Sequence, residues 1–316
     1  MAIKLCIGPM SKCVVDAVLE LDEERRQLVS FIPSRRQIEY SGGYVCNWTT
    51  NEFSSYVNNK VQIHRDHGGP GQGSNDDDGY KSFEEDTKYF DLIHVDPWAK
   101  YQDYDTGLKH TIESIHYIHH LNPNIKFEVG TEESIKRFEP DELRKLMHDL
   151  KKNLSPDAFK NIKYCVVQSG VGLDLFNMRN TGKFSAGRLR EMNKVCHDFD
   201  VLSKEHNADY LAKPEIEERS ELGLDTINIA PEFGQIETLC YIEALSDSDL
   251  EKFYDICYNS KRWEKWISAS DTKDIKKLIQ VCGHYVFTNE EFISFKPNLD
   301  NLVKEKIKNR INLIIN

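Results

Sequence analysis

The sequence predicts an α/β protein, a (β/α)8 barrel with a small helical extension at its C-terminus. Two observations lead to this prediction. Over residues 1–246, short apolar segments of strand length alternate eight times with amphipathic segments of helix length. Over residues 247–316 the strand signals stop, and helical segments rich in Lys and Glu follow. A doubly wound open sheet is the competing architecture, because it uses the same alternation.

Each predicted strand is a run of apolar residues bounded by polar or turn-forming residues. Thr49 followed by Glu52 is a capping-box signature for the start of a helix, and Asn122-Pro123 marks the end of another. A short helix is predicted to begin at Ser82. In chain order the predicted strands cover residues 5–8, 27–33, 61–64, 90–96, 125–130, 164–170, 201–206 and 226–230. The remaining predicted helices cover residues 11–21, 49–57, 106–121, 140–154, 185–199, 214–222 and 232–245.

The composition is that of an ordinary globular protein that works in water. Of 316 residues, 39% are hydrophobic and 29% are charged, and no apolar run reaches the roughly 18 residues that a membrane span needs. The net charge of −11 argues against nucleic acid as a partner. The first predicted strand is not preceded by a signal-peptide pattern. The cysteines form no CxxC pair, and four of them stand in apolar surroundings: Cys6, Cys46, Cys165 and Cys240. We therefore expect buried thiols and a cytoplasmic location.

Polar side chains stand at the end of nearly every predicted strand after the first. In a (β/α)8 barrel the carboxyl ends of all the strands meet in one bowl, so these residues are expected to face a common site. The Val61–Pro70 stretch is the most informative, because an apolar strand runs into Asp66 and His67 and then into glycines. In chain order the strand-end residues are Arg35, Arg36, Gln37, Asp66, His67, His94, Asp96, Glu128, Gln168, Ser169, Glu205, His206 and Asn228.

Two of these residues, His67 and His206, are predicted to bind a divalent metal ion. Imidazole nitrogen is a common ligand of Zn²⁺ and of its neighbours in the transition series. The two histidines are too far apart in sequence for a local finger, so the fold must assemble the site. His94 has two interpretations, a ligand or a hydrogen-bonded core residue. Asp66, Asp96 and Glu128 are the candidate catalytic carboxylates.

Two segments are candidates for phosphate binding. Ser34, Arg35, Arg36 and Gln37 follow an apolar strand, and arginine matches phosphate in a bidentate way. The competing interpretation is that these arginines pair with acids such as Glu39. Backbone N–H groups around Ser169 and Gly170 could also cradle a phosphate, although the same residues fit a plain tight turn.

The strand-end motifs resemble, in the same order, those of the tagatose-bisphosphate aldolase accessory-subunit family, which belongs with the class II, metal-dependent fructose-bisphosphate aldolases. The resemblance is distant and spans about residues 5–245. Asp66-His67-x-Gly-Pro70 and Glu205-His206-x-x-Asp-Tyr210 are its most specific parts. The other matching segments are Gly42–Tyr44, Ile93–Asp96, Gly130–Glu132 and Val167–Gly170.

The resemblance implies a role for several residues. It implies that Asp66 is the proton-transfer acid and base and that His67 and His206 are zinc ligands. Class II aldolases place a third histidine where this chain has Gln168, so Glu128 or Gln168 would have to complete the ligand set. Asn228 is expected near the phosphate and the enediolate. The Arg35-Arg36 pair departs from the family pattern, so the sugar is expected to differ from tagatose bisphosphate.

These observations are compatible with three functions. The first is a metal-dependent aldolase, a lyase that cleaves or forms a C–C bond of a ketose phosphate through an enediolate, most simply with Zn²⁺. The second is an epimerase of a ketose phosphate or ketouronate that uses the same residues. The third is a non-catalytic accessory subunit of a sugar-bisphosphate aldolase. The expected partner is a small phosphorylated sugar, and neither a membrane nor a nucleic acid is expected to bind. The sequence is compatible with a monomer and with a homo-oligomer.

Overall fold

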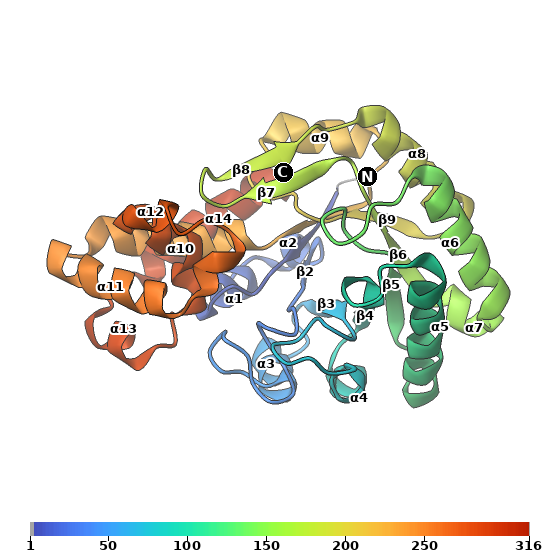
Figure 1. The fold of residues 1–316 in the computed structure, drawn as a ribbon, viewed down its shortest axis with the longest axis horizontal. Helices are drawn as coiled ribbons and strands as arrows, with labels where there is room; N and C mark the ends of the chain where they lie inside the picture. The colour runs from blue at the N-terminus through green and yellow to red at the C-terminus, as the bar shows by residue number, and fades with distance from the viewer. Residues whose placement is uncertain (1–2, 316) are drawn as a thin grey trace.

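The structure is a computed structural model that describes residues 3–315, and in these residues eight parallel strands close into a barrel (Figure 1). Each strand pairs with its neighbours in parallel, and β10 returns to β1 to close the ring. The predicted fold class is therefore confirmed, and the open sheet is excluded. The strands, in order around the barrel, are β1 (Lys4–Ile7), β2 (Val29–Phe31), β3 (Gln62–Gly68), β4 (Leu92–Val95), β5 (Lys126–Val129), β6 (Ile162–Val167), β9 (Leu202–Glu205) and β10 (Thr226–Ile229).

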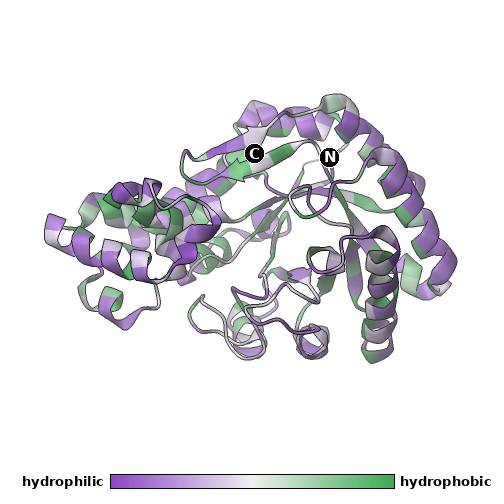
Figure 2. Ribbon diagram, in the orientation of Figure 1, coloured by the Kyte–Doolittle hydropathy of each residue, from purple (hydrophilic) through white to green (hydrophobic). Residues whose placement is uncertain are grey.

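The helices cover the outside of the barrel. Figure 2 shows hydrophilic residues on their outward faces, as expected for amphipathic helices that bury one side against strands. The capping box of Thr49 and Glu52 is formed. The helices of this part are α1 (Lys12–Leu19), α2 (Glu23–Arg26), α3 (Thr50–Val57), α4 (Tyr80–Tyr89), α5 (Tyr104–Leu121), α6 (Pro140–Asn153), α7 (Pro156–Lys160), α8 (Ala186–Asp198), α9 (Lys213–Glu221) and α10 (Pro231–Ala244), with the 3₁₀ turn η1 (Pro97–Ala99).

The structure differs from the sequence predictions in local detail, and the short helices α2 and α7 are among the elements that were not predicted. The helix expected to begin at Ser82 begins at Tyr80, after Gly79 in the left-handed conformation, and no side chain caps it. The antiparallel hairpin after β6, formed by β7 (Val171–Asp174) and β8 (Arg179–Gly182), was not expected from the sequence. These strands are short and half-buried, so they lack the apolar runs by which the barrel strands were found.

The C-terminal segment is helical, as predicted. Its helices are α11 (Asp247–Asn259), α12 (Ile275–Cys282), α13 (Glu290–Phe295) and α14 (Asp300–Ile315), with the 3₁₀ turns η2 (Arg262–Lys265), η3 (Asp271–Lys273) and η4 (Gly283–Tyr285). Helices α11 to α13 pack on α10 around a second hydrophobic cluster. Helix α14 instead returns to the barrel, where Val303, Ile307 and Ile311 join the main core beside α1. The boundary at residue 246 stays a prediction.

The hairpin β7–β8 joins the barrel to this extension, as Figure 1 shows from its position beside α10 and α12. Gln280 and Lys277 of α12 donate hydrogen bonds to the backbone carbonyl of Phe176, at 3.2 and 2.8 Å. Leu175 is buried in the second hydrophobic cluster. The extension is therefore attached to the barrel on the side where the strand ends open. Among residues 3–315, no helix has both the length and the apolar character to cross a membrane.

Candidate active site

The site lies at the carboxyl ends of the barrel strands, where three imidazole rings meet. The ring centroids of His67 and His206 are 5.1 Å apart, and His94 lies 5.0 Å from His67 and 5.3 Å from His206. The two rings predicted to share a metal ion thus lie side by side, with their planes at 84° to each other, although 139 positions separate them in the chain. Asp66 is close enough to both for one oxygen and two ring nitrogens to lie within 4.8 Å of one another.

Strand β3 positions His67 through an irregular end. The strand runs past the predicted residue 64 as far as Gly68, and its register with β4 shifts between Arg65 and Gly68. His67 has a φ of 46°, in the left-handed region that side chains other than glycine rarely adopt. Such backbone strain clusters at functional sites, because the surrounding structure must hold it in place. The bulge turns His67 into the bowl beside Asp66.

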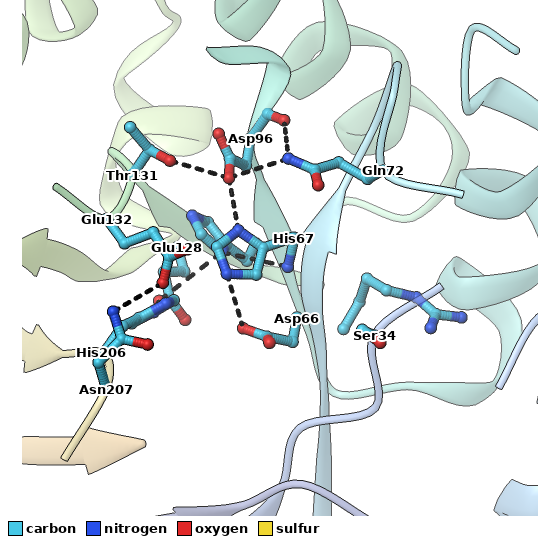
Figure 3. Close-up of polar contacts among 12 residues, drawn as sticks. Ser34, Asp66, His67, Gln72, Asp96, Glu128, Thr131, Glu132, His206 and Asn207 are labelled. Carbon is cyan, nitrogen blue, oxygen red and sulfur yellow. Dashed lines mark hydrogen bonds and ion pairs between the residues drawn. The ribbon is translucent and has the colours of Figure 1, made fainter. Parts of the chain in front are cut away.

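Asp96 holds the ring of His67 (Figure 3). Nδ1 of His67 donates to Oδ2 of Asp96 at 2.5 Å, and the same oxygen accepts from Thr131 and Gln72 at 3.0 and 3.1 Å. Burial opposes the imidazolium form, but the charge of Asp66 and the hydrogen bond to Asp96 raise the pKa of His67 to about 10. The bond to Asp96 leaves Nε2 of His67 facing Asp66, whose Oδ1 is 3.8 Å away.

Glu128 plays the same part for His206. Its Oε1 accepts from Nε2 of His206 at 2.8 Å, and its Oε2 accepts from Nζ of Lys204 at 2.5 Å. Burial raises the pKa of Glu128, but Lys204 and the two nearby histidines outweigh it and hold the pKa well below its usual range. Each of these two neighbouring histidines thus has a carboxylate on one nitrogen, an arrangement that orients an imidazole for a metal ion.

Both ring nitrogens of His94 form hydrogen bonds with the backbone. Its Nε2 donates to the carbonyl of Gly130 at 2.9 Å, and its Nδ1 accepts from the backbone N–H of His67 at 3.3 Å. Burial lowers the pKa of His94, so the ring is neutral. The geometry fits the hydrogen-bonded core residue rather than the free ligand.

A cavity of about 740 Å³ opens above these rings. Asp66 and Asn228 line it, and Oδ1 of Asp66 and both amide atoms of Asn228 are buried without a hydrogen-bond partner among the described residues. Buried polar atoms are nearly always hydrogen-bonded, so these three atoms point to a ligand or to water. Ser34, Arg36 and Gln37 line the same cavity.

Three predicted site residues are used differently. Arg35 is buried and ion-paired with Glu39 and Asp77, at 2.6 and 2.7 Å, and this matches the competing interpretation of that segment. The amide of Gln168 donates to the carbonyls of Thr131 and Lys136 and accepts from Phe138, so no free amide atom remains for a metal ion. Gly170 lines a separate cavity, beside α8.

Ser169 and Gln37 are intermediate cases. Oγ of Ser169 is buried without a partner among residues 3–315, but it faces a small cavity behind His206 and not the large one. The side chain of Gln37 bonds to the backbone of Ser34 and to Met10, so it shapes the wall of the large cavity. Ser34 and Arg36 are therefore the members of the predicted phosphate segment that can still meet a ligand in the large cavity, although Nε of Arg36 also donates to the carbonyl of Gly73 at 3.2 Å.

Two carboxylates of the cavity, Glu132 and Asp209, were missed from the sequence. Oε2 of Glu132 accepts from Asn207 at 3.0 Å. Burial and the neighbouring Glu232 raise the pKa of Asp209 to about 7, although Asp209 accepts two backbone N–H groups. Both residues stand inside motifs that the resemblance singled out, Gly130–Glu132 and Glu205–Tyr210, so a signal was present.

Seven of the eight cysteines are buried and all are free, and Cys46 is only half-buried. The expectation of buried thiols therefore holds for Cys6, Cys165 and Cys240 and is wrong for Cys46.

No known sequence family and no curated protein matches this chain. Several solved structures are similar to it in fold. A probable tagatose 6 phosphate kinase from Sinorhizobium meliloti 1021 is 14% identical with a TM-score of 0.72, over 100% of this chain and 99% of that one. The YdjI aldolase from Escherichia coli K12 is 14% identical with a TM-score of 0.57, over 99% and 91% of the two chains.

An epimerase is among the similar structures too. The fructuronate-tagaturonate epimerase UxaE from Cohnella laeviribosi is 9% identical with a TM-score of 0.57, over 98% of this chain and 78% of that one. This chain has the barrel fold of these proteins. The distant resemblance expected from the sequence is thus confirmed at the level of the fold, which is what identities this low can establish.

Proposed function

We propose that this protein is a metal-dependent aldolase that cleaves or forms a C–C bond of a ketose phosphate. The observation that carries the proposal is the pair of neighbouring rings, His67 and His206, each held by a buried carboxylate. Beside them lies Asp66, whose Oδ1 has no hydrogen-bond partner among residues 3–315. Similar folds in an aldolase and an epimerase support the same class of chemistry. Eight free cysteines fit a reducing cytoplasm.

The donor atoms fit a divalent cation of the zinc type. His67 and His206 would hold it through their free ring nitrogens, and Asp96 and Glu128 would orient the rings. A bound cation would polarise the ketose carbonyl and stabilise the negative charge of the enediolate. Gln168 is not part of this ligand set, because its amide is fully engaged.

The chain's own residues would move the protons. In the cleavage direction the Asp66 carboxylate takes the hydroxyl proton next to the bond that breaks. The O–H electron pair becomes the aldehyde C=O, and the C–C electron pair stays on the ketone fragment as an enediolate. The enediolate carbon would regain the proton that Asp66 took, by way of water and Glu132, a further carboxylate of the cavity, and the amide of Asn228 would bind a substrate oxygen.

The test is an aldol assay of dihydroxyacetone phosphate with a panel of aldehydes, with and without a chelator. We expect chelator-sensitive turnover that a His206→Ala variant abolishes. His197→Ala is the matched control, because His197 also pairs with a carboxylate, Asp225 at 2.8 Å, but lies outside the cavity. Chelator-insensitive turnover, or full activity in His206→Ala, would contradict the proposal.

An epimerase of a ketose phosphate or ketouronate is the second candidate, favoured by the similar fold of the epimerase from Cohnella laeviribosi. Retro-aldol cleavage followed by re-addition on the other face would use the same residues. Mass spectrometry and sugar chromatography separate the two, because an epimerase yields an isomer of unchanged mass. An accessory subunit would bind no metal and turn over neither kind of substrate.

A further inference from the structure

The C-terminal extension supplies part of the wall of the cavity above the histidines. The residues from the extension that line it come from η2 and its flanks and from Tyr285. These residues are about 200 positions from Asp66 in the chain, and they lie where the barrel strands open. The extension therefore closes one side of the cavity, so its side chains meet whatever enters.

The extension is held in place by aromatic side chains. Trp263 is buried, and its Nε1 donates to the carbonyl of Tyr258 at 2.9 Å. Nε1 of Trp266 donates to Oη of Tyr285 at 3.1 Å, and the ring of Tyr285 packs against Tyr44 of the barrel at 5.0 Å between centroids. The wall formed by η2 and Tyr285 is thus fixed to the barrel on one side and to α11 on the other.

Four cationic side chains line the cavity: Arg36 from the barrel and Lys261, Arg262 and Lys265 from the extension. All four residues are exposed, so they stand at its mouth. Within residues 3–315, none of them forms an ion pair, although Glu264 lines the same cavity. Arg36 donates to the carbonyl of Gly73 at 3.2 Å, and Nζ of Lys265 lies 4.4 Å from the centre of the Trp266 ring.

This mouth differs in charge from the rest of the cavity and of the chain. The residues near the histidines are carboxylates, Asp66, Glu132 and Asp209, and the whole chain carries a net charge of −11. Desolvation and the charge of Arg36 lower the pKa of Lys265, while Glu132 raises it. Four cations against the carboxylates of Glu264 and the deeper Glu132 leave an excess of positive charge at the mouth, and an anion that binds between the cations relieves their repulsion.

We propose that Arg36, Arg262 and Lys265 form an anion subsite at the mouth of the cavity, which takes the phosphoryl group of the substrate. This inference rests on the proposed function and extends it, because it adds two cations of the extension to Arg36, the strand-end arginine that is not ion-paired. The substrate is then an open-chain sugar whose phosphate lies at the end remote from the carbonyl carbon that reaches His67 and His206. Arg35 takes no part, since Glu39 and Asp77 occupy it.

Inorganic phosphate is the probe, and isothermal titration calorimetry on the full chain measures its Kd. We expect the Arg262→Met/Lys265→Met double variant to bind phosphate at least about tenfold more weakly, because charge-assisted hydrogen bonds are lost. Met keeps the apolar stem against the aromatic rings. The matched control is Lys273→Met/Lys276→Met, which removes two exposed lysines of the same extension outside the cavity and should leave the Kd unchanged.

The outcomes separate the subsite from the proposed function. Wild-type protein that binds no phosphate up to millimolar concentration overturns the subsite, as does a double variant with unchanged Kd. Metal content is measured in parallel and should be the same in all variants. If phosphate binding falls as expected but no aldol or epimerase activity is found, the subsite stands and the proposed function fails. If sugar phosphates are turned over in a chelator-sensitive way but the double variant keeps its phosphate Kd, the function stands and the subsite fails.

Discussion

Replacing Lys204 by Met should destabilise the barrel strongly. Nζ of Lys204 is 2.5 Å from Oε2 of Glu128, and their side chains are 1% and 0% exposed. Met keeps the length of the stem, so the change leaves almost no void and mainly removes the positive charge. Breaking a buried pair by removing one partner costs about 3–5 kcal/mol, because the other charge stays buried. Without Lys204, the Glu128 carboxylate keeps only its contact with Nε2 of His206, and its Oε2 loses its cation. We expect a loss of this size in the free energy of unfolding.

Urea unfolding followed by circular dichroism measures the free energy of unfolding, and two further variants serve as a control and as a rescue. Lys163→Met is the matched control, because this lysine also lies on a barrel strand but forms no ion pair within residues 3–315. Its Nζ is 3.4 Å from Oε1 of the exposed Gln62 and 5.1 Å from the centre of the Tyr164 ring. It should change the stability by less than about 1 kcal/mol. A Lys204→Met/Glu128→Gln double variant should regain most of the loss, since no unpaired charge is left buried.

The pH dependence supplies a second readout of the same pair. The folded protein holds the pKa of Glu128 below its ordinary value of 4.5, so the carboxylate contributes its full stability above about pH 4.5 and loses it as the pH falls. Lys204→Met should therefore shift acid unfolding to higher pH. A Lys204→Met variant whose free energy of unfolding stays within about 1 kcal/mol of the wild type would refute the reasoning.

Three other residues give independent predictions. Asp96→Asn should weaken zinc binding by about 10–100-fold in a competition assay with a chromogenic chelator, because it frees the His67 ring, whereas Asp225→Asn should have no effect. Folding raises the pKa of His67 from 6.5 to about 10, so protonated His67 stabilises the metal-free protein fully below about pH 6.5, and this stabilisation is lost as the pH rises toward 10. In urea titrations at a series of pH values, the free energy of unfolding of His67→Gln should therefore vary less with pH than that of the wild type. Arg310→Met should cost about 1–3 kcal/mol in urea unfolding, because Arg310 of α14 donates to Glu232 at 2.6 Å, and an unchanged midpoint would contradict a stabilising role for this contact.

The sequence alone determined the barrel and most of its strand ends. Each strand is a local apolar run, and most helices carry their own caps, so residues close in the chain contain the information. Because parallel strands of a closed barrel end on one face, the motifs around His67, Glu128 and His206 could be assigned to a single site before any distance was known. The observed centroid separation of 5.1 Å between His67 and His206 agrees with that assignment.

Only the tertiary structure decided which polar groups of that face remain free. Arg35 and Arg36 are adjacent in sequence, but Asp77, 42 positions away, occupies Arg35 and leaves Arg36 facing the cavity. The amide of Gln168 is likewise taken by carbonyls 32 and 37 positions away. The cations of η2 and the return of α14 to the barrel also escaped prediction. Ion pairs and cavity walls depend on distances in space between segments remote in the chain, and no local periodicity records them.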